Sequence, residues 1–158
     1  MNKQKTKKIL FFITLFVFLL MPRTLCGQEF ENTKHYISIG FLDHKTGNSF
    51  LGYTRSIVQN KNNELFVGGG TLIASNTLLI GFKKYLFRSF VDGYSTVSMQ
   101  KIYGMGGQVK SLGLSMGVEK KIWKLLFLNL GFHTLVELNS ITNSELLAFP
   151  NLNLNIRF

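Results

Sequence analysis

Polar and apolar residues alternate without interruption over the last eight residues of the chain, Asn151–Phe158. A period of two places alternate side chains on opposite faces of a β-strand. Asn is a poor strand former, so a row of three asparagines on one face indicates that this face is wet or hydrogen-bonded. The chain is therefore expected to end in a strand with one polar and one apolar face. The polar face holds Asn151, Asn153, Asn155 and Arg157, and the apolar face holds Leu152, Leu154, Ile156 and Phe158.

Seven further short apolar runs, separated by polar clusters, have the same strand-like character. No window repeats with a helical period, and no apolar run is long enough to cross a membrane as a helix. A weak repeat occurs three times. In each copy, a strand that contains a glycine and a basic residue is followed by a short link and then by a second apolar strand. The predicted strands are His35–Leu42, Ser49–Ile57, Glu64–Ile73, Thr77–Tyr85, Phe90–Ser98, Leu112–Lys121, Leu125–Leu138 and Asn151–Phe158.

This pattern predicts an all-β fold, an antiparallel up-and-down barrel of eight strands in which the last strand returns to the first. Glycines recur on the polar faces, and glycine inside a strand normally weakens it, so their repetition indicates crowding on that side. An eight-stranded barrel has an interior just wide enough for side chains. The polar face is therefore predicted to be the interior and the apolar face the outside, whereas a soluble barrel would invert this arrangement.

These features resemble bacterial outer-membrane β-barrels, whose closing strand is apolar outside, polar inside and ends in an aromatic residue. The links support the resemblance, because short links (59–63, 86–89, 122–124) alternate with mostly longer ones (43–48, 74–76, 99–111, 139–150), as periplasmic turns alternate with extracellular loops. The resemblance implies a monomer in contact with outer-membrane lipid. It also implies that the barrel assembly machinery reads the terminal strand through Leu152, Leu154, Ile156 and Phe158.

The first residues have the layout of a secretory signal peptide. Four lysines precede the apolar run Ile9–Met21, and a small-residue site follows near Gly27. We expect residues 1–27 to be removed and residues 28–158 to form one barrel domain. An uncleaved anchor is the alternative, but the run is shorter than the ~20 residues that a spanning helix needs. Cys26 is the only cysteine, so no internal disulfide is possible, and Leu25 before it does not fit a lipidation signal.

Much of the net charge of +10 belongs to this leader, which holds five of the 18 basic residues and no acidic one. The remaining 18 − 5 = 13 basic and 8 acidic residues give a balance of +5, spread over many positions. This mild excess predicts no nucleic-acid binding.

Eight titratable residues are predicted to point into the barrel. In a narrow lumen an unpaired charge is costly, so we interpret the set as a structural, salt-bridged plug, with a polar path for small solutes or protons as the alternative. Pairing about the Phe87-Arg88 link would bring Lys83 opposite Asp92. The predicted interior cluster is Glu64, Lys83, Asp92, Glu119, Lys121, His133, Glu137 and Arg157.

His133 is the candidate for catalysis, since an outer-membrane hydrolase or acyltransferase can place a His beside a Ser. No Ser or acid stands at a recognisable spacing from it, and Glu137 is too far along an extended strand to orient the ring. A structural role is favoured. His35 and His44 have no cysteine beside them, and Gly104–Gly107 does not match a phosphate loop, so we expect neither a metal nor a cofactor.

We therefore expect a non-enzymatic outer-membrane barrel with a structural or surface-interaction role, with recognition of an extracellular partner through Met99–Ser111 and Asn139–Pro150. One alternative is a lipid-modifying enzyme that uses His133. The other is a soluble periplasmic barrel that binds an apolar ligand inside. The direction of the apolar face discriminates between the membrane and the soluble barrel.

Overall fold

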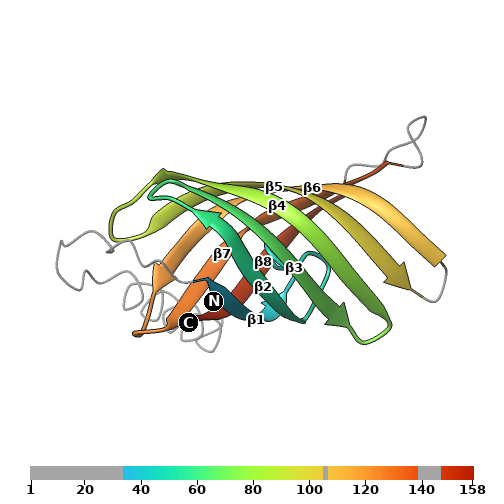
Figure 1. Cartoon of the computed structure of the whole chain (residues 1–158), viewed down its shortest axis with the longest axis horizontal. Helices are drawn as coiled ribbons and strands as arrows, with labels where there is room; N and C mark the ends of the chain where they lie inside the picture. The colour runs from blue at the N-terminus through green and yellow to red at the C-terminus, as the bar shows by residue number, and fades with distance from the viewer. Residues whose placement is uncertain (1–33, 105–106, 139–146) are drawn as a thin grey trace, which may run out of the picture.

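The computed structural model describes residues 34–104, 107–138 and 147–158, so the expected signal segment with Cys26 lies outside the described residues. The described residues form one closed antiparallel barrel in which every strand pairs with its neighbours in the sequence and β1 pairs with β8 (Figure 1). The predicted eight-stranded all-β fold is confirmed. The strands are β1 (His35–Phe41), β2 (Leu51–Gln59), β3 (Asn63–Leu72), β4 (Ser75–Phe87), β5 (Asp92–Gly104), β6 (Gly107–Lys121), β7 (Leu126–Glu137) and β8 (Leu147–Arg157). No helix among these residues is long and apolar enough to span a membrane.

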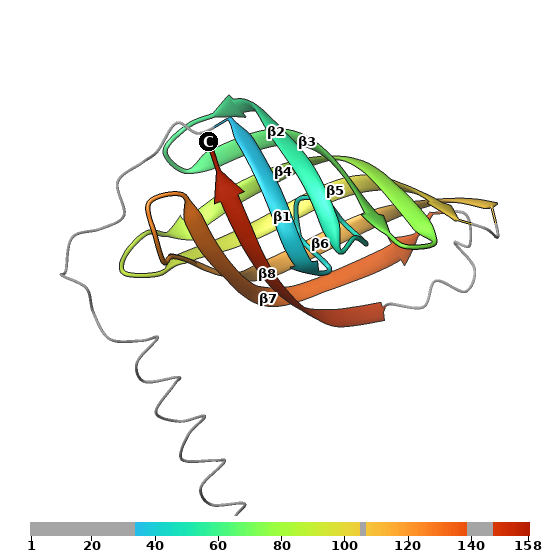
Figure 2. The same ribbon diagram turned by 90° about the horizontal axis from the view of Figure 1, so that it is seen from below.

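The two ends of the described chain meet at one end of the barrel. The backbone N–H of His35 donates to the carbonyl of Phe158 at 3.1 Å, and the short links β2–β3, β4–β5 and β6–β7 lie at this same end. We call it the terminal end and the opposite one the far end. β1 and β2 have 7 and 9 residues, whereas β5 and β6 have 13 and 15, so the wall is uneven at the far end. Figure 2 shows β5 and β6 reaching well beyond β1 and β2.

The link predicted at Met99–Ser111 is mostly strand, which corrects the sequence-based boundaries. Pairing continues beyond Gln100 and Ser111 to Gly104 opposite Gly107. The strand formers Ile102, Tyr103 and Val109 sustain this extension, and the polar residues and glycines around them had suggested a loop. The result is a longer β5–β6 hairpin at the far end, where β4 still pairs with β5 as far as Ser75 opposite Gly104.

β8 begins at Leu147, four residues earlier than predicted, and includes Pro150. Its pairing with β1 ends at Leu152, so the strand has only β7 as a neighbour at Pro150. Proline is tolerated at such an edge because no second ladder requires its missing N–H. The rest of the predicted loop Asn139–Pro150 lies outside the described residues.

Polar side chains point inward and apolar side chains outward on β8, as the alternation predicts. The apolar set on this strand is between 38% and 54% exposed, whereas Arg157 and the three asparagines are at most 6% exposed. The other strands share this arrangement, with exposed Leu78, Ile80, Met99, Met116 and Phe132 on the outside. The molecule therefore has a polar core and an apolar outer surface.

Candidate functional site

The link between β1 and β2 turns into the barrel and fills part of its lumen (Figures 1 and 2). We call residues 42–50 the plug. Leu42 to Gly47 and Ser49 are all buried, and a narrow turn closes where the N–H of Gly47 donates to the carbonyl of Asp43 at 2.7 Å. The sequence pattern had grouped 43–48 with the longer links at one end of the barrel, and the link does leave the wall at that end, but it turns into the lumen instead of forming a surface loop. Polar composition suggested a surface loop, but the lumen of this barrel is itself polar.

Glycines on the inner faces of β2 and β3 make room for the plug. A Cβ at Gly52 would overlap the side chain of Thr46, and a Cβ at Gly68 would overlap the backbone carbonyl of Lys45. Gly70 has the same relationship to Ser49. The crowding predicted from inward glycines therefore exists, and on β2 and β3 its source is the plug rather than side chains from the opposite wall.

Hydrogen bonds attach the plug to several strands. The carbonyl of Lys45 accepts from Thr54 on β2 at 3.1 Å, and that of Asn48 accepts from Thr77 on β4 at 3.1 Å. Asn153 on β8 donates to the carbonyl of Leu42 at 3.3 Å. Buried backbone carbonyls need partners of this kind, since no strand ladder satisfies them in a loop. The plug is thus an integral part of the core.

Charged and aromatic contacts fix the tip of the plug. Lys45 Nζ lies 2.6 and 2.7 Å from the two carboxylate oxygens of Glu64 and 3.5 Å from the ring centroid of Tyr36. The ring of His44 packs on that of Tyr94, with centroids 4.3 Å apart. Nδ1 of His44 lies 2.9 Å from a carboxylate oxygen of Asp43, its neighbour in the plug. Cation–π and ion-pair contacts together neutralise the buried ammonium of Lys45.

A second ion cluster closes the interior nearer the terminal end. Glu119 on β6 lies 2.5 Å from Lys83 Nζ and 2.7 Å from an Arg157 nitrogen, and it accepts a hydrogen bond from the Tyr85 hydroxyl at 2.9 Å. The guanidinium carbon of Arg157 also sits 3.6 Å from the ring centroid of Phe127. One carboxylate is therefore shared by two cations, which come from strands far apart in the sequence.

The structure places most of the predicted interior set inside the barrel. Glu64, Lys83, Glu119 and His133 are fully buried, and Asp92 and Arg157 nearly so. Lys121 is half-buried at the end of β6, while Glu137 is exposed. Glu137 pairs with Ser111 near the far end. The wall extends past the plug there, so the side chain of Glu137 points inward but stays exposed to solvent.

The expected pairing of Lys83 with Asp92 is wrong. Lys83 stands opposite Thr96, because the β4–β5 link lies at residues 88–91, two residues further along the chain than the predicted 86–89, and its ion partner is Glu119. Asp92 stands opposite Glu119 on β6 instead. The sequence around Phe87-Arg88 carries no glycine or asparagine that would mark where the chain turns. A bulge between Tyr85 and Phe87 changes the register by only one residue.

His133 has a serine beside it, which sequence spacing did not reveal. Ser115 on β6 stands directly opposite His133 on β7, with its hydroxyl 2.6 Å from Nδ1, and Gln100 Nε2 lies 3.2 Å from the other ring nitrogen. Each ring nitrogen of His133 thus has a hydrogen-bonding partner, the Ser115 hydroxyl at Nδ1 and the Gln100 side-chain amide at Nε2.

The contacts of Ser115 and Lys45 differ in how far they could have been predicted. Because the β6–β7 hairpin is nearly symmetric about Lys124, counting back from His133 leads to Ser115, so a hairpin register alone would have found this pair. No comparable signal exists for Lys45, which reaches Glu64 only because the whole link turns inward. That course depends on three-dimensional space left by glycines on other strands.

Within the described ranges no group of three His, Cys, Asp or Glu residues could hold a metal ion. No protein-family model, curated protein or solved structure matches this chain.

Proposed function

We propose that this protein is an integral outer-membrane β-barrel with a sealed interior, and that its role is structural or depends on recognition at its surface. One observation carries the proposal, namely that the apolar residues of the barrel face outward while its ionised residues face inward. A protein in water would expose the opposite set, since large contiguous apolar patches are rare on soluble monomers. In transmembrane barrels, too, apolar residues face outward and polar residues face inward.

The height of the apolar outer surface matches a membrane. Along β6 the outward residues between Lys110 and Lys120 are Leu112, Leu114, Met116 and Val118. Ten residues at about 3.3 Å each cover about 33 Å of strand, and a tilt of about 45° reduces this to about 23 Å of height. The apolar band of outer-membrane barrels is about 25 Å tall. A lysine thus stands at each edge of a band of the required height.

The filled interior supports a role without transport. The plug and the Glu119 cluster occupy successive levels of the lumen, and their charges are paired with one another or with wall residues. A path for solutes would need mobile water and charges left open to it, whereas these groups are buried. We therefore assign these buried ionised groups a stabilising role.

Recognition is expected at the far end, through the β5–β6 hairpin. Its tip carries exposed Gly104, Gly107, Gln108 and Val109 beyond the level of β1 and β2. Because the plug turns inward, the β5–β6 hairpin reaches beyond the far ends of β1 and β2 (Figure 2). An extracellular partner would meet these residues first.

The two alternatives are less well supported. A soluble barrel that binds an apolar ligand needs an apolar cavity, and the described interior is lined by serines, threonines, asparagines and ions. A lipid-modifying enzyme needs an accessible nucleophile and a base able to take its proton. Ser115 and His133 are both buried, so a lipid in the surrounding membrane cannot reach them.

Fractionation and gel mobility test the proposal. The protein expressed with its leader should sediment with outer membranes, and the unheated sample should migrate differently from the boiled one on a denaturing gel, because a barrel with all edges paired resists detergent. Recovery in the soluble periplasmic fraction would refute the membrane assignment.

A further inference from the structure

Two lysines stand side by side on the outer face of the projecting hairpin. Lys101 on β5 and Lys110 on β6 are direct cross-strand partners. Like charges directly opposite each other in a sheet repel and destabilise it, with Cβ atoms only about 4.5–5.5 Å apart. The Lys101 ammonium lies 4.9 Å from the ring centroid of Tyr103 on the same strand. Within 34–104, 107–138 and 147–158, no carboxylate forms an ion pair with either lysine.

The acidic residue that lies nearest to the two lysines in the strand pairing is on the inner face of the barrel. Glu137 pairs with Ser111, one position further along β6 than Lys110. Successive residues of a strand point to opposite faces, so Glu137 cannot neutralise Lys110 without leaving its own face. The two lysines therefore form a cationic pair on the outer surface.

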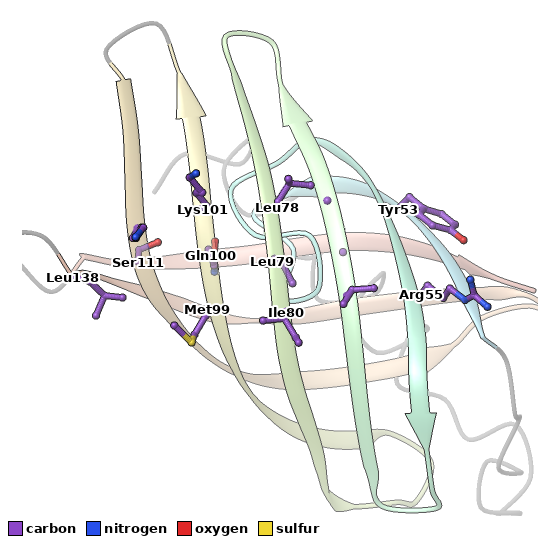
Figure 3. A pocket seen from close by; sticks show the side chains of 14 residues that line it. Tyr53, Arg55, Leu78, Leu79, Ile80, Met99, Gln100, Lys101, Ser111 and Leu138 are labelled. Carbon is purple, nitrogen blue, oxygen red and sulfur yellow. The ribbon is translucent and has the colours of Figure 1, made fainter.

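An apolar hollow of about 750 Å³ adjoins this pair on the outer wall (Figure 3). Lys101 and Lys110 stand at one side of it, and Tyr53 and Arg55 at the other. Its floor includes Gly69, which has no side chain and pairs with Tyr53 on one side and Leu78 on the other. Its apolar lining includes Val67, Leu78, Ile80, Met99 and Leu138.

We propose that Lys101 and Lys110 bind the phosphate of an anionic membrane lipid whose acyl chain lies in the hollow. This inference rests on the membrane location proposed above. Charge complementarity selects the occupant, because two adjacent ammonium groups attract a phosphate, and the lysines lie at the edge of the apolar band, at the level where headgroups meet acyl chains. An apolar protein segment could fill the hollow but would leave the repulsion between the lysines unrelieved.

The test compares lipid retention by three proteins. Wild type, Lys101→Gln/Lys110→Gln and the control Lys61→Gln/Lys84→Gln are reconstituted with equal amounts of phosphatidylglycerol and phosphatidylcholine that have identical acyl chains. After extraction into neutral detergent, native mass spectrometry counts the lipids that remain bound. Wild type and the control should retain phosphatidylglycerol over phosphatidylcholine by roughly tenfold, and Lys101→Gln/Lys110→Gln should show no preference. An equal preference in all three proteins would overturn the site.

A second variant and a soluble anion make the result specific. Lys110→Glu creates an opposite-charge pair with Lys101, which favours the hairpin, and it should also abolish the preference. If an excess of inorganic phosphate removes the bound phosphatidylglycerol from wild type, the lysines bind a free anion and the lipid assignment is wrong. Heat-modifiable mobility of the same samples reports insertion. Wild type that fails to insert contradicts the membrane proposal, whereas inserted wild type without lipid preference contradicts only this site.

Discussion

The ammonium of Lys45 and the carboxylate of Glu64 form a buried ion pair that attaches the plug to β3, with Nζ–O distances of 2.6 and 2.7 Å. Ser56 on β2 donates a further hydrogen bond to the same carboxylate. Each group would be unfavourable in the lumen without the other, because burial removes its hydration. The pair therefore couples the position of the plug to the ionisation of the wall.

Lys45→Met should destabilise the barrel by about 3–5 kcal/mol, since it leaves Glu64 buried without its cation. Lys45→Met/Glu64→Gln removes the orphaned charge and should recover a large part of this loss. Urea unfolding followed by gel mobility measures both, with Lys61→Met in an exposed turn as the control. Equal stability of Lys45→Met and the control would show that the pair contributes nothing.

Gly68→Ala should displace the plug, whereas Gly69→Ala should not. The added methyl at Gly68 meets the Lys45 carbonyl and Thr54, both fixed in the core, while at Gly69 it meets the flexible end of Leu78 at 3.0 Å on the outer face. Overpacking of this kind costs about 1–3 kcal/mol. Trypsin should cleave after Lys45 in the folded Gly68→Ala variant only, and mass spectrometry of the fragments identifies the site. Resistance of both variants would mean that the plug adapts to the methyl.

Glu119→Gln should be more damaging than Lys83→Met. The first leaves Lys83 and Arg157 buried together without an anion, and the second leaves the Glu119–Arg157 pair in place. We expect the loss of unfolding free energy to be at least twice as large for Glu119→Gln, on the scale of about 3–5 kcal/mol for a broken buried pair. The denaturant midpoints of the two variants decide this, and the reverse order would contradict the assignment of Glu119 as the shared anion.

Leu154→Arg should prevent stable insertion, and Asn153→Ser should be tolerated. Leu154 is outward and 42% exposed, so arginine there would meet hydrocarbon at a cost of about 2–4 kcal/mol near the midplane. Asn153 is inward, so serine there loses the hydrogen bond to the Leu42 carbonyl but places no polar group in hydrocarbon, and insertion should persist. Outer-membrane fractionation with heat-modifiable mobility compares the two. Equal insertion would remove the lipid-facing assignment of β8.

His133→Ala should lower stability by about 1–3 kcal/mol and leave membrane lipid composition unchanged. The substitution leaves Ser115 and Gln100 with unsatisfied buried hydrogen-bonding groups, which accounts for the cost. Lipid extracts of cells carrying wild type and variant provide the second measurement. Loss of a deacylated or acyl-transferred lipid with the barrel still folded would establish catalysis by this pair.

Much of the fold could be predicted because strand alternation is a local property. The alternation of polar and apolar residues indicated which face Leu154 and Asn153 would each occupy. The same alternation indicated the faces of the residues in β6 and β7. The predictions that failed depend on contacts between residues far apart in the sequence. The inward course of Lys45 depends on glycines in β2 and β3, and the anion that pairs with Lys83 comes from β6, two strands away. The pattern of polar and apolar residues indicates which side chains are exposed, but it does not indicate whether the segment between two strands turns into the barrel or away from it.

The inward course of residues 42–50 also determines where foreign sequence could be displayed on this scaffold. A peptide inserted beside Thr46 or Gly47 would have to fit among buried wall residues, and Gly47 already leaves no space for a methyl against Gln100. An insertion after Gly104, at the exposed end of β5, would leave the barrel ladder intact. Epitope tags and engineered binding loops therefore belong on the β5–β6 hairpin, although residues 42–50 are the more polar stretch.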